Sequence, residues 1–283
     1  MLNLDAYFSR IGYTGPRQAS LDVLTAICRG HSSSIAFENI DSLLGRTPAL
    51  EPAALHGKLV AQLRGGYYFE HNSLLRDVLK TLGMKVSSLS ARVVWMMPQE
   101  APLTPRTHML LKVEVPDCEG ISYVVDMGFG GQLLDAPLAL TPGVEQPSHL
   151  NRMRITHADD SYVVETQLPQ GWMPMYRFTL DEHEPVDYEP LNWFTASHPT
   201  SLFRHNLLIQ KLGPHGRTNL LNDRLVTMAK GEEPKVRRIE DASDFADVLH
   251  QVFGIRPPVP PSELFARIPK QMEGIFIPDS ASP

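Results

Sequence analysis

The spacing of apolar residues changes at Met84, and this change limits the folds open to the chain. Before Met84, apolar residues recur about every 3.6 residues, as on the buried face of a helix. After it they alternate with a period of about two, as in strands with one buried face. Successive strands without intervening helices favour antiparallel pairing in a barrel or a sandwich. The sequence therefore predicts an α+β protein with helices first and an antiparallel sheet after them.

Capping and turn residues set the predicted ends of the elements. We expect helices that begin after Asn3, after Ser20 and at Pro52, and a fourth over residues 68–82. Strands are predicted at residues 86–95, 108–115, 121–127, 152–155, 162–165, 172–178, 202–210 and 219–228. A helix over residues 244–253 and a disordered tail from Pro278 complete the prediction.

The start of the fourth helix carries the most informative side chain. Arg64, Gly65 and Gly66 lead through Tyr67 directly into it. A side chain in the first turn meets unpaired N–H groups and the positive end of the helix dipole. Proteins place nucleophilic thiolates there because this field lowers the pKa of a thiol. In this chain the position holds a phenol, Tyr68.

A histidine and an aspartate flank the predicted hairpin centred near Asp117. His108 lies nine residues before this turn and Asp126 nine after it. In an antiparallel pair with that register the two face each other, about 5 Å apart at Cβ. A register shifted by one residue would place them on opposite faces. A carboxylate beside an imidazole orients the ring and raises its basicity, so the pair is a candidate catalytic base.

Composition and charge exclude several classes of protein. The formal net charge of −6 argues against an electrostatic hold on nucleic acid or an anionic membrane. The N-terminus lacks a signal pattern and no apolar run approaches ~18 residues, so a cytoplasmic protein is expected. Cys28 and Cys118 lie far apart, which suggests neither zinc nor a disulfide, and no metal is expected. Neither cysteine is near the fourth helix start, so neither is the nucleophile.

Four stretches of the chain resemble the arylamine N-acetyltransferase family. The family signature reads Arg-Gly-Gly-aromatic-Cys-Phe-Glu-x-Asn, and the chain departs from it at Tyr68, where the family has its cysteine. The matching residues are Arg64, Gly65, Gly66, Tyr67, Phe69, Glu70 and Asn72. Residues 36–40, 107–108 and 125–130 fit the same family in order and spacing, and the likeness spans essentially all 283 residues.

The resemblance implies acyl transfer in two steps. Acetyl-coenzyme A acylates the cysteine that His and Asp activate, and an arylamine, hydrazine or arylhydroxylamine then takes the acyl group. By resemblance, the catalytic positions are Tyr68, His108 and Asp126, the aromatic acceptor pocket is Phe37, Val93, Phe129 and Phe203, and the coenzyme A contacts are Thr107, Gly128 and Gly130. The three phenylalanines also fit an ordinary core.

The family fold comprises an N-terminal helical bundle, an antiparallel β-barrel and a C-terminal α/β lid. By resemblance these parts correspond to residues 1–83, 84–190 and 191–283. The implied site lies between the first two parts, which agrees with the change of period at Met84. Glu38 and Arg64 are expected to pair structurally, tying the first helices to the loop before Tyr68.

A phenol changes the chemistry of such a site. With a pKa near 10, against ~8.5 for a thiol, only about 0.1 % of it is phenolate at pH 7. The helix field and His108 are expected to lower the pKa of Tyr68 by about one or two units. The tyrosine hydroxyl lies further from the backbone than a cysteine sulfur, so we expect it to overshoot the imidazole or turn away.

Several functions remain open from the sequence. Tyr68 could carry the acyl group as an aryl ester, or His108 could act as general base for direct attack of an amine on the thioester. The chain could instead have lost acetyl transfer and bind coenzyme A, small aromatics or a partner. It could also be a variant, since one nucleotide change converts a cysteine codon to tyrosine. A papain-like hydrolase lacks its nucleophile equally, and closure of amides on carrier-bound chains is a further option. The donor acyl chain, the natural acceptor and the oligomeric state are not in the sequence.

Overall fold

The computed structural model describes residues 2–98 and 100–269. The disorder predicted for the tail from Pro278 lies outside these residues. The helices before the barrel are α1 (Leu4–Ile11), α2 (Leu21–Ser34), α3 (Ile40–Leu43), α4 (Pro52–Leu55), a π-helical turn (His56–Ala61) and α5 (Tyr68–Thr81). Those after it are a 3-10 turn (Pro185–Asp187), α6 (Tyr188–Ser197), α7 (Leu202–His205), α8 (Ala242–Asp247), a π-helical turn (Val248–Phe253) and α9 (Pro261–Ala266).

Capping residues fix the ends of the first helices. The side chain of Asn3 accepts a hydrogen bond from the backbone N–H of Ala6, and Gly12 ends α1 in the left-handed region at φ 65°. Ser20 caps α2 in the same manner as Asn3 caps α1, and Pro52 lies in the first turn of α4. These starts confirm the sequence prediction for the three helices.

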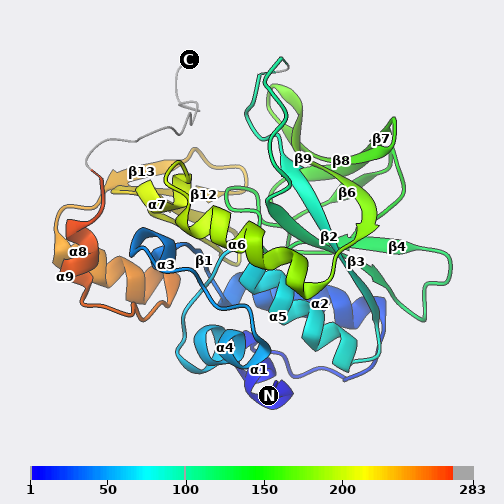
Figure 1. Cartoon of the computed structure of the whole chain (residues 1–283), viewed down its shortest axis with the longest axis horizontal. Helices are drawn as coiled ribbons and strands as arrows, with labels where there is room; N and C mark the ends of the chain where they lie inside the picture. The colour runs from blue at the N-terminus through cyan, green and yellow to red at the C-terminus, as the bar shows by residue number, and fades with distance from the viewer. Residues whose placement is uncertain (1, 99, 270–283) are drawn as a thin grey trace.

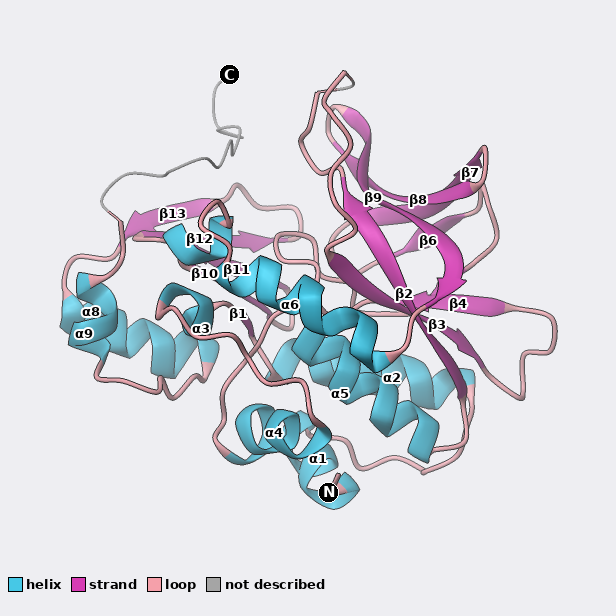
Figure 2. Cartoon of the chain, viewed as in Figure 1, coloured by secondary structure: helices cyan, strands magenta, loops and turns pink. Residues whose placement is uncertain are grey.

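An eight-stranded antiparallel sheet forms the middle of the molecule and curls into a nearly closed barrel (Figure 2). Its strand order is β5-β4-β3-β2-β9-β8-β7-β6. The strands are β2 (Lys85–Val93), β3 (His108–Glu114), β4 (Ser122–Val125), β5 (Leu138–Ala139), β6 (Glu145–Pro147), β7 (Arg152–Ala158), β8 (Ser161–Leu168) and β9 (Gly171–Glu182). The α+β class and the antiparallel sheet after Met84 are therefore confirmed. Helix α5 packs against β2 and β3, which brings the start of α5 to the barrel.

A second sheet, of five strands, lies beside the barrel (Figure 1). Its order is β1-β10-β11-β12-β13, with strands β1 (Phe37–Glu38), β10 (Leu208–Leu212), β11 (Gly216–Leu221), β12 (Arg224–Ala229) and β13 (Lys235–Arg238). Strand β1 comes from the first part of the chain and pairs antiparallel with β10. The division at residues 83 and 190 remains a prediction, but this pairing joins the two ends of the chain in one sheet.

Two of the predicted strands are wrong in their bounds. Residues 202–210 contain α7 before β10 begins, because Ser201 caps a short helix there. Residues 219–228 are a hairpin of β11 and β12 that turns at Asn222 and Asp223. Asn222 has φ 53°, a left-handed conformation that asparagine adopts more readily than most residues.

Two apolar cores hold these layers together. The larger one joins the N-terminal helices to the barrel, and the smaller one lies between the five-stranded sheet and α8, the turn after it and α9. Cys28 is fully buried in the larger core, as predicted from its place on the apolar face of α2. No helix within residues 2–98 or 100–269 is long and apolar enough to cross a membrane.

Candidate active site

The start of α5 is held tightly from two sides. Tyr67 lies at the N-cap position, and the Glu70 carboxylate accepts a hydrogen bond from the Tyr67 N–H at 3.1 Å. Gly128 packs against the first turn so closely that a Cβ on it would lie 2.3 Å from the Cα of Tyr68. Only glycine allows this approach. Tyr68 is thus fixed at the first position of the helix, beside the loop that follows β4.

His108 and Asp126 meet at this point. The Nε2 atom of His108 lies 2.6 Å from Oδ2 of Asp126, and both side chains are buried. The register differs from the predicted one by two residues, because Leu111 pairs with Val125. A shift of two keeps both side chains on one face, so the contact survives as a diagonal one.

The Asp126 carboxylate is ionised by its surroundings. Its Oδ1 atom accepts hydrogen bonds from the Asn72 amide at 3.0 Å and from the Gly128 N–H at 2.9 Å. Burial opposes its charge, but His108 and these hydrogen bonds outweigh burial and hold the pKa of Asp126 below its ordinary value. Because Nε2 of His108 faces this carboxylate, Nδ1 is the nitrogen left for a reacting group.

Tyr176, on β9, is a member of the site that the sequence reasoning missed. Its ring centroid lies 5.0 Å from that of His108. Burial, and after it the charge of Asp126, raises the pKa of the Tyr176 phenol well above its ordinary value. The hydroxyl therefore lies in the field of the carboxylate. Only knowledge that β2 pairs with β9 would have placed it there, since Val93 is opposite Tyr176 in that pair.

The phenol of Tyr68 turns away from the imidazole. Its hydroxyl donates to Oγ1 of Thr195 on α6 at 3.0 Å, while its ring lies edge-on to His108 with centroids 4.8 Å apart. The predicted lowering of its pKa is wrong: burial raises the pKa of Tyr68 above its ordinary value, although hydrogen bonds with Thr195 and Thr107 act in the other direction. Tyr68 is therefore a neutral phenol at pH 7.

Helix α6, which carries Thr195, was also missed by the sequence reasoning. It runs across the start of α5 (Figure 1), and its Asn192 contacts the hydroxyl of Tyr67 and donates to Pro48 O at 2.8 Å. The apolar residues of α6 do not fall on one buried face, since Trp193 in the middle of the helix is 55 % exposed. The periodic apolar pattern that predicts a helix is therefore weak here. Pro185, which begins the turn before α6, was the available signal for a helix start.

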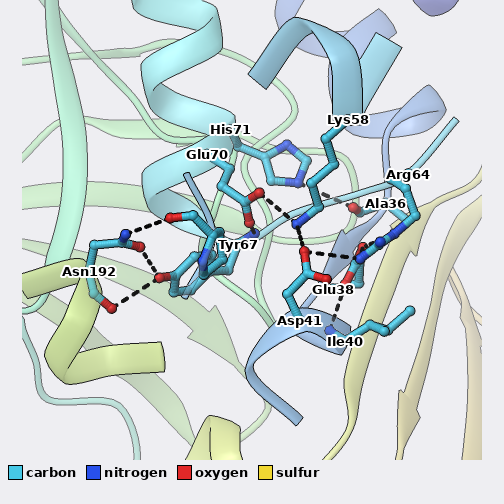
Figure 3. A network of polar contacts seen from close by, with 11 residues as sticks. Ala36, Glu38, Ile40, Asp41, Lys58, Arg64, Tyr67, Glu70, His71 and Asn192 are labelled. Atoms are coloured by element: carbon cyan, nitrogen blue, oxygen red, sulfur yellow. Dashed lines mark hydrogen bonds and ion pairs between the residues drawn. The ribbon is translucent and has the colours of Figure 1, made fainter. Parts of the chain in front are cut away.

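A buried network of charges supports the loop before Tyr68 (Figure 3). Arg64 lies 2.7 Å from Glu38, which confirms the expected structural pair, and 3.3 Å from Asp41. Lys58 lies 2.6 Å from both Asp41 and Glu70. Burial raises the pKa of Glu70 to about 7. The positive charge of Lys58 lowers this pKa, and the negative charge of Glu38 raises it again. Three carboxyl groups thus share two cations, and one of them titrates near neutral pH.

The aromatic residues predicted for the acceptor surround Tyr68 and His108. Phe203 lies 6.0 Å from Tyr68 and 6.1 Å from Phe37, measured between ring centroids. The ring centroid of Phe129 lies 5.5 Å from that of His108. Phe37 and Phe129 are buried and belong to the larger core, so these rings serve packing whatever else they do. Val93, half-buried at the end of β2, packs against the same core.

The residues predicted for coenzyme A lie along the rim of this region. Thr107 is half-buried and directly precedes β3. Its hydrogen bond with the phenol of Tyr68 acts to lower the pKa of that phenol. Gly130 lies against Phe37, whose ring a Cβ on Gly130 would approach to 2.9 Å. Gly128 and Gly130 thus allow close approach because they carry no side chain. Among the described residues, no group of three or more His, Cys, Asp and Glu side chains could hold a metal ion.

Comparison with known proteins gives this arrangement a family. Residues 20–258 match a family described as N-acetyltransferase. The arylamine N-acetyltransferase of Mycobacterium tuberculosis is 40 % identical over 255 residues, which cover 90 % of this chain and 89 % of the relative. That of Escherichia coli is 37 % identical over 253 residues, or 89 % and 88 % of the two chains.

Solved structures agree with the sequence comparison. The Mycobacterium marinum arylamine N-acetyltransferase superposes with a TM-score of 0.90 at 37 % identity, covering 94 % of this chain and 98 % of that one. The same enzyme in complex with CoA matches with the same score and coverage. The family match over residues 20–258 and the shared fold place the chain in the N-acetyltransferase class. The chain belongs to the arylamine N-acetyltransferase family.

Proposed function

We propose that the protein transfers an acetyl group from a coenzyme A thioester to an arylamine, hydrazine or arylhydroxylamine, with Tyr68, His108 and Asp126 in its catalytic positions. The observation that carries the proposal is the buried His108–Asp126 contact of 2.6 Å, directly beside the first turn of α5. An imidazole oriented by an ionised carboxylate is a general base.

The geometry supports direct transfer over an acyl-tyrosine intermediate. The Tyr68 hydroxyl is neutral and hydrogen-bonded to Thr195, so it is neither activated nor aimed at His108. In direct transfer the amine nitrogen attacks the thioester carbonyl, and Nδ1 of His108 takes the proton that the nitrogen loses. The carbon–sulfur bond then breaks, and the thiolate of coenzyme A leaves and receives that proton.

The pocket residues of the proposal follow the positions described above. Phe37, Val93, Phe129 and Phe203 are proposed to contact the aromatic acceptor. Thr107, Gly128 and Gly130 are proposed to border the thioester of coenzyme A. The segment 191–283 is proposed to act as a lid, because α6 carries two side chains that contact Tyr67 and Tyr68.

The setting of the activity is proposed from the same similarity. Small aromatic amines, including foreign ones, are the proposed acceptors, and acetyl-coenzyme A is the proposed co-substrate without a metal. The cytoplasm is the proposed location, since acetyl-coenzyme A is made and used inside cells. No nucleic-acid or membrane partner is proposed, consistent with the formal net charge of −6.

A second candidate function follows from the burial of the site. His108 is 1 % exposed, and the ring of Tyr68 lies against it. A substrate reaches the imidazole only if side chains around it move, and the Tyr68 ring is one of those that cover it. If the ring stays in place, the chain binds coenzyme A, a small aromatic or a partner without acetyl transfer.

The proposal is tested by turnover and intact-protein mass spectrometry with acetyl-coenzyme A and a panel of arylamines and hydrazines. We expect turnover without an acetyl adduct on the protein, and its loss in His108→Ala. An adduct on Tyr68 would replace direct transfer by the carrier route. Absence of turnover, with coenzyme A still bound, would favour the second function.

The matched variant is Tyr68→Cys. We expect a large gain in arylamine acetylation, together with an acetyl adduct on the new cysteine, because a thiolate at a helix start is a better nucleophile than a neutral phenol. No gain in a folded variant would show that the rest of the pocket no longer supports acetyl transfer.

A further inference from the structure

The five-stranded sheet has two unlike faces. One face carries apolar side chains, such as Ile209 and Leu220, that pack against α8 and the helical turn after it. The opposite face carries polar side chains: Gln210 pairs with Asn219 across β10 and β11, and Arg217 pairs with Leu212. This polar face turns toward the barrel, since the backbone N–H of Gly131 donates to the Gln210 side chain.

Arg217 is a buried cation without a balancing anion. It is 9 % exposed and forms no ion pair with any residue in the described part of the chain. Its Nη2 atom contacts only the sulfur of Met228, at 3.5 Å, and its Nε atom is buried without a hydrogen-bond partner. By contrast, buried Arg64 lies 2.7 Å from the Glu38 carboxylate. A buried charge without a partner is costly.

Burial is the cause of an altered ionisation at Arg217. Desolvation lowers the pKa of its guanidinium to about 10, and no acidic neighbour raises it again. The guanidinium still carries its full charge at neutral pH. Asp135, the acidic side chain of the adjoining loop, accepts hydrogen bonds from Ser148 and from the N–H of His149 instead. The positive charge is therefore uncompensated within its surroundings.

A small cavity lies beside this guanidinium. It has a volume of about 10 Å³, and its lining mixes apolar residues, such as Leu150 and Leu212, with polar ones, among them Gln132, His149, Asn151 and Arg217. A space of this size holds one water-sized or monatomic species. His149 also lines the cavity, and its Nε2 atom is buried without a partner, so this nitrogen donates to an occupant in the tautomer that carries its proton there.

We propose that this cavity binds a small monatomic anion, chloride in solution, held by Arg217 and by His149. Such an ion supplies the charge that the guanidinium lacks, which a water molecule cannot do. It also joins the loop at residues 148–151 to β11, and so ties the five-stranded sheet to the barrel. Chloride is slightly larger than a water molecule, so the walls must give by a few tenths of an ångström to admit it, whereas phosphate is far too large for the cavity. This site is separate from the proposed acetyl-transfer function.

The direct test is anomalous diffraction from crystals of the whole protein grown or soaked in bromide. We expect a bromide peak beside the Arg217 guanidinium, at the low millimolar to 0.2 M concentrations used for halide soaks. The proposal would be overturned if no bromide peak appears there, or if an ordered water occupies this position in crystals soaked in bromide.

The second test follows thermal unfolding in sodium gluconate as it is replaced by sodium bromide at constant ionic strength. We expect the midpoint to rise by about 2–4 °C over 0.2 M halide, because a ligand of the folded state stabilises it. Arg217→Met should lose this dependence, and should fold because it replaces an unpaired buried charge by an apolar chain of similar length. Exposed Arg46→Met is the control and should keep the dependence. Equal halide dependence in both variants would contradict the proposal.

Discussion

At the scale of single residues, the side chain of Tyr68 decides the chemistry. Its hydroxyl has a partner of its own in Thr195, so the phenol is satisfied without the imidazole. Tyr67, next to it, is held in the same way by Asn192. Two adjacent tyrosines at the start of α5 are thus anchored to α6 by hydrogen bonds. The position implied for a nucleophile has become part of the packing between two helices.

This arrangement predicts that the Tyr68 hydroxyl is dispensable for turnover. In Tyr68→Phe, acetyl transfer should stay within a few-fold of the unmodified protein, while unfolding becomes easier by about 1 kcal/mol through loss of the bond to Thr195. Steady-state kinetics and denaturant unfolding measure both. Tyr67→Phe is the matched control, with a similar effect on stability. A complete loss of turnover in Tyr68→Phe alone would show that the hydroxyl takes part in the reaction.

We predict that the free energy of unfolding depends on pH because of Glu70. Its pKa is raised from 4.5 to about 7 in the folded protein, so the folded state binds this proton more tightly than the unfolded state. The stability therefore falls as pH rises through that window, by up to about 3 kcal/mol. Glu70→Gln should remove this part of the slope between pH 5 and 7. The exposed Glu51→Gln should leave it unchanged, and an unaltered slope in Glu70→Gln would refute the assignment.

At the scale of elements, the helices before the barrel were predictable because their signals are local. Asn3, Ser20 and Pro52 act on the next few residues of the backbone, and the structure confirms each of them. The predicted register of β3 and β4 differs from the observed one by two residues. The prediction assumed that the turn is centred on Asp117. The contact of His108 with its carboxylate survived because an even shift preserves the face.

The elements missed or misplaced depend on contacts distant in sequence. Helix α6 carries an exposed Trp193 and lacks a regular apolar stripe, so its position is set by contact with α5. Tyr176 lies beside His108 only because β2 pairs with β9. The hairpin at Asn222 had a local signal, an asparagine and an aspartate between apolar runs, that the strand prediction passed over.

The junction of α5 with the glycine loop gives a prediction of its own. Gly128→Ala should lower stability by about 2–3 kcal/mol, because the new Cβ would overlap the backbone at Tyr68 and push the loop away from the helix. The displaced loop carries Asp126, so turnover should fall as well. Gly57→Ala is the control, since a Cβ there meets nothing within 4 Å. Equal stability of the two variants in denaturant unfolding would show that the loop at Gly128 moves away from α5 without a cost in stability.

At the scale of the whole molecule, Asn39 fastens the first part of the chain to the last. Its amide donates to Phe203 O at 2.9 Å and to Asn206 O at 2.7 Å, and its carbonyl accepts from the Leu208 N–H at 2.7 Å. Together with the pairing of β1 and β10, these bonds make the five-stranded sheet a joint product of both ends.

We therefore predict that the protein unfolds in one cooperative transition. Asn39→Ala leaves several buried backbone groups without partners and should lower the free energy of unfolding by about 3 kcal/mol. Calorimetry should give equal calorimetric and van't Hoff enthalpies for the unmodified protein. Two separated transitions, with Asn39→Ala shifting only one, would show that the C-terminal sheet is an independent unit.

The hydrogen bonds of Asn39 have a consequence for folding during synthesis. Asn39 leaves the ribosome long before Phe203, which follows it by 164 residues. During that interval β1 has Gly66 on one side but no neighbour on the side that later pairs with β10, and closing so long a loop is slow. Nascent chains that stall before β10 emerges carry an open strand edge, the kind of surface that chaperones cover.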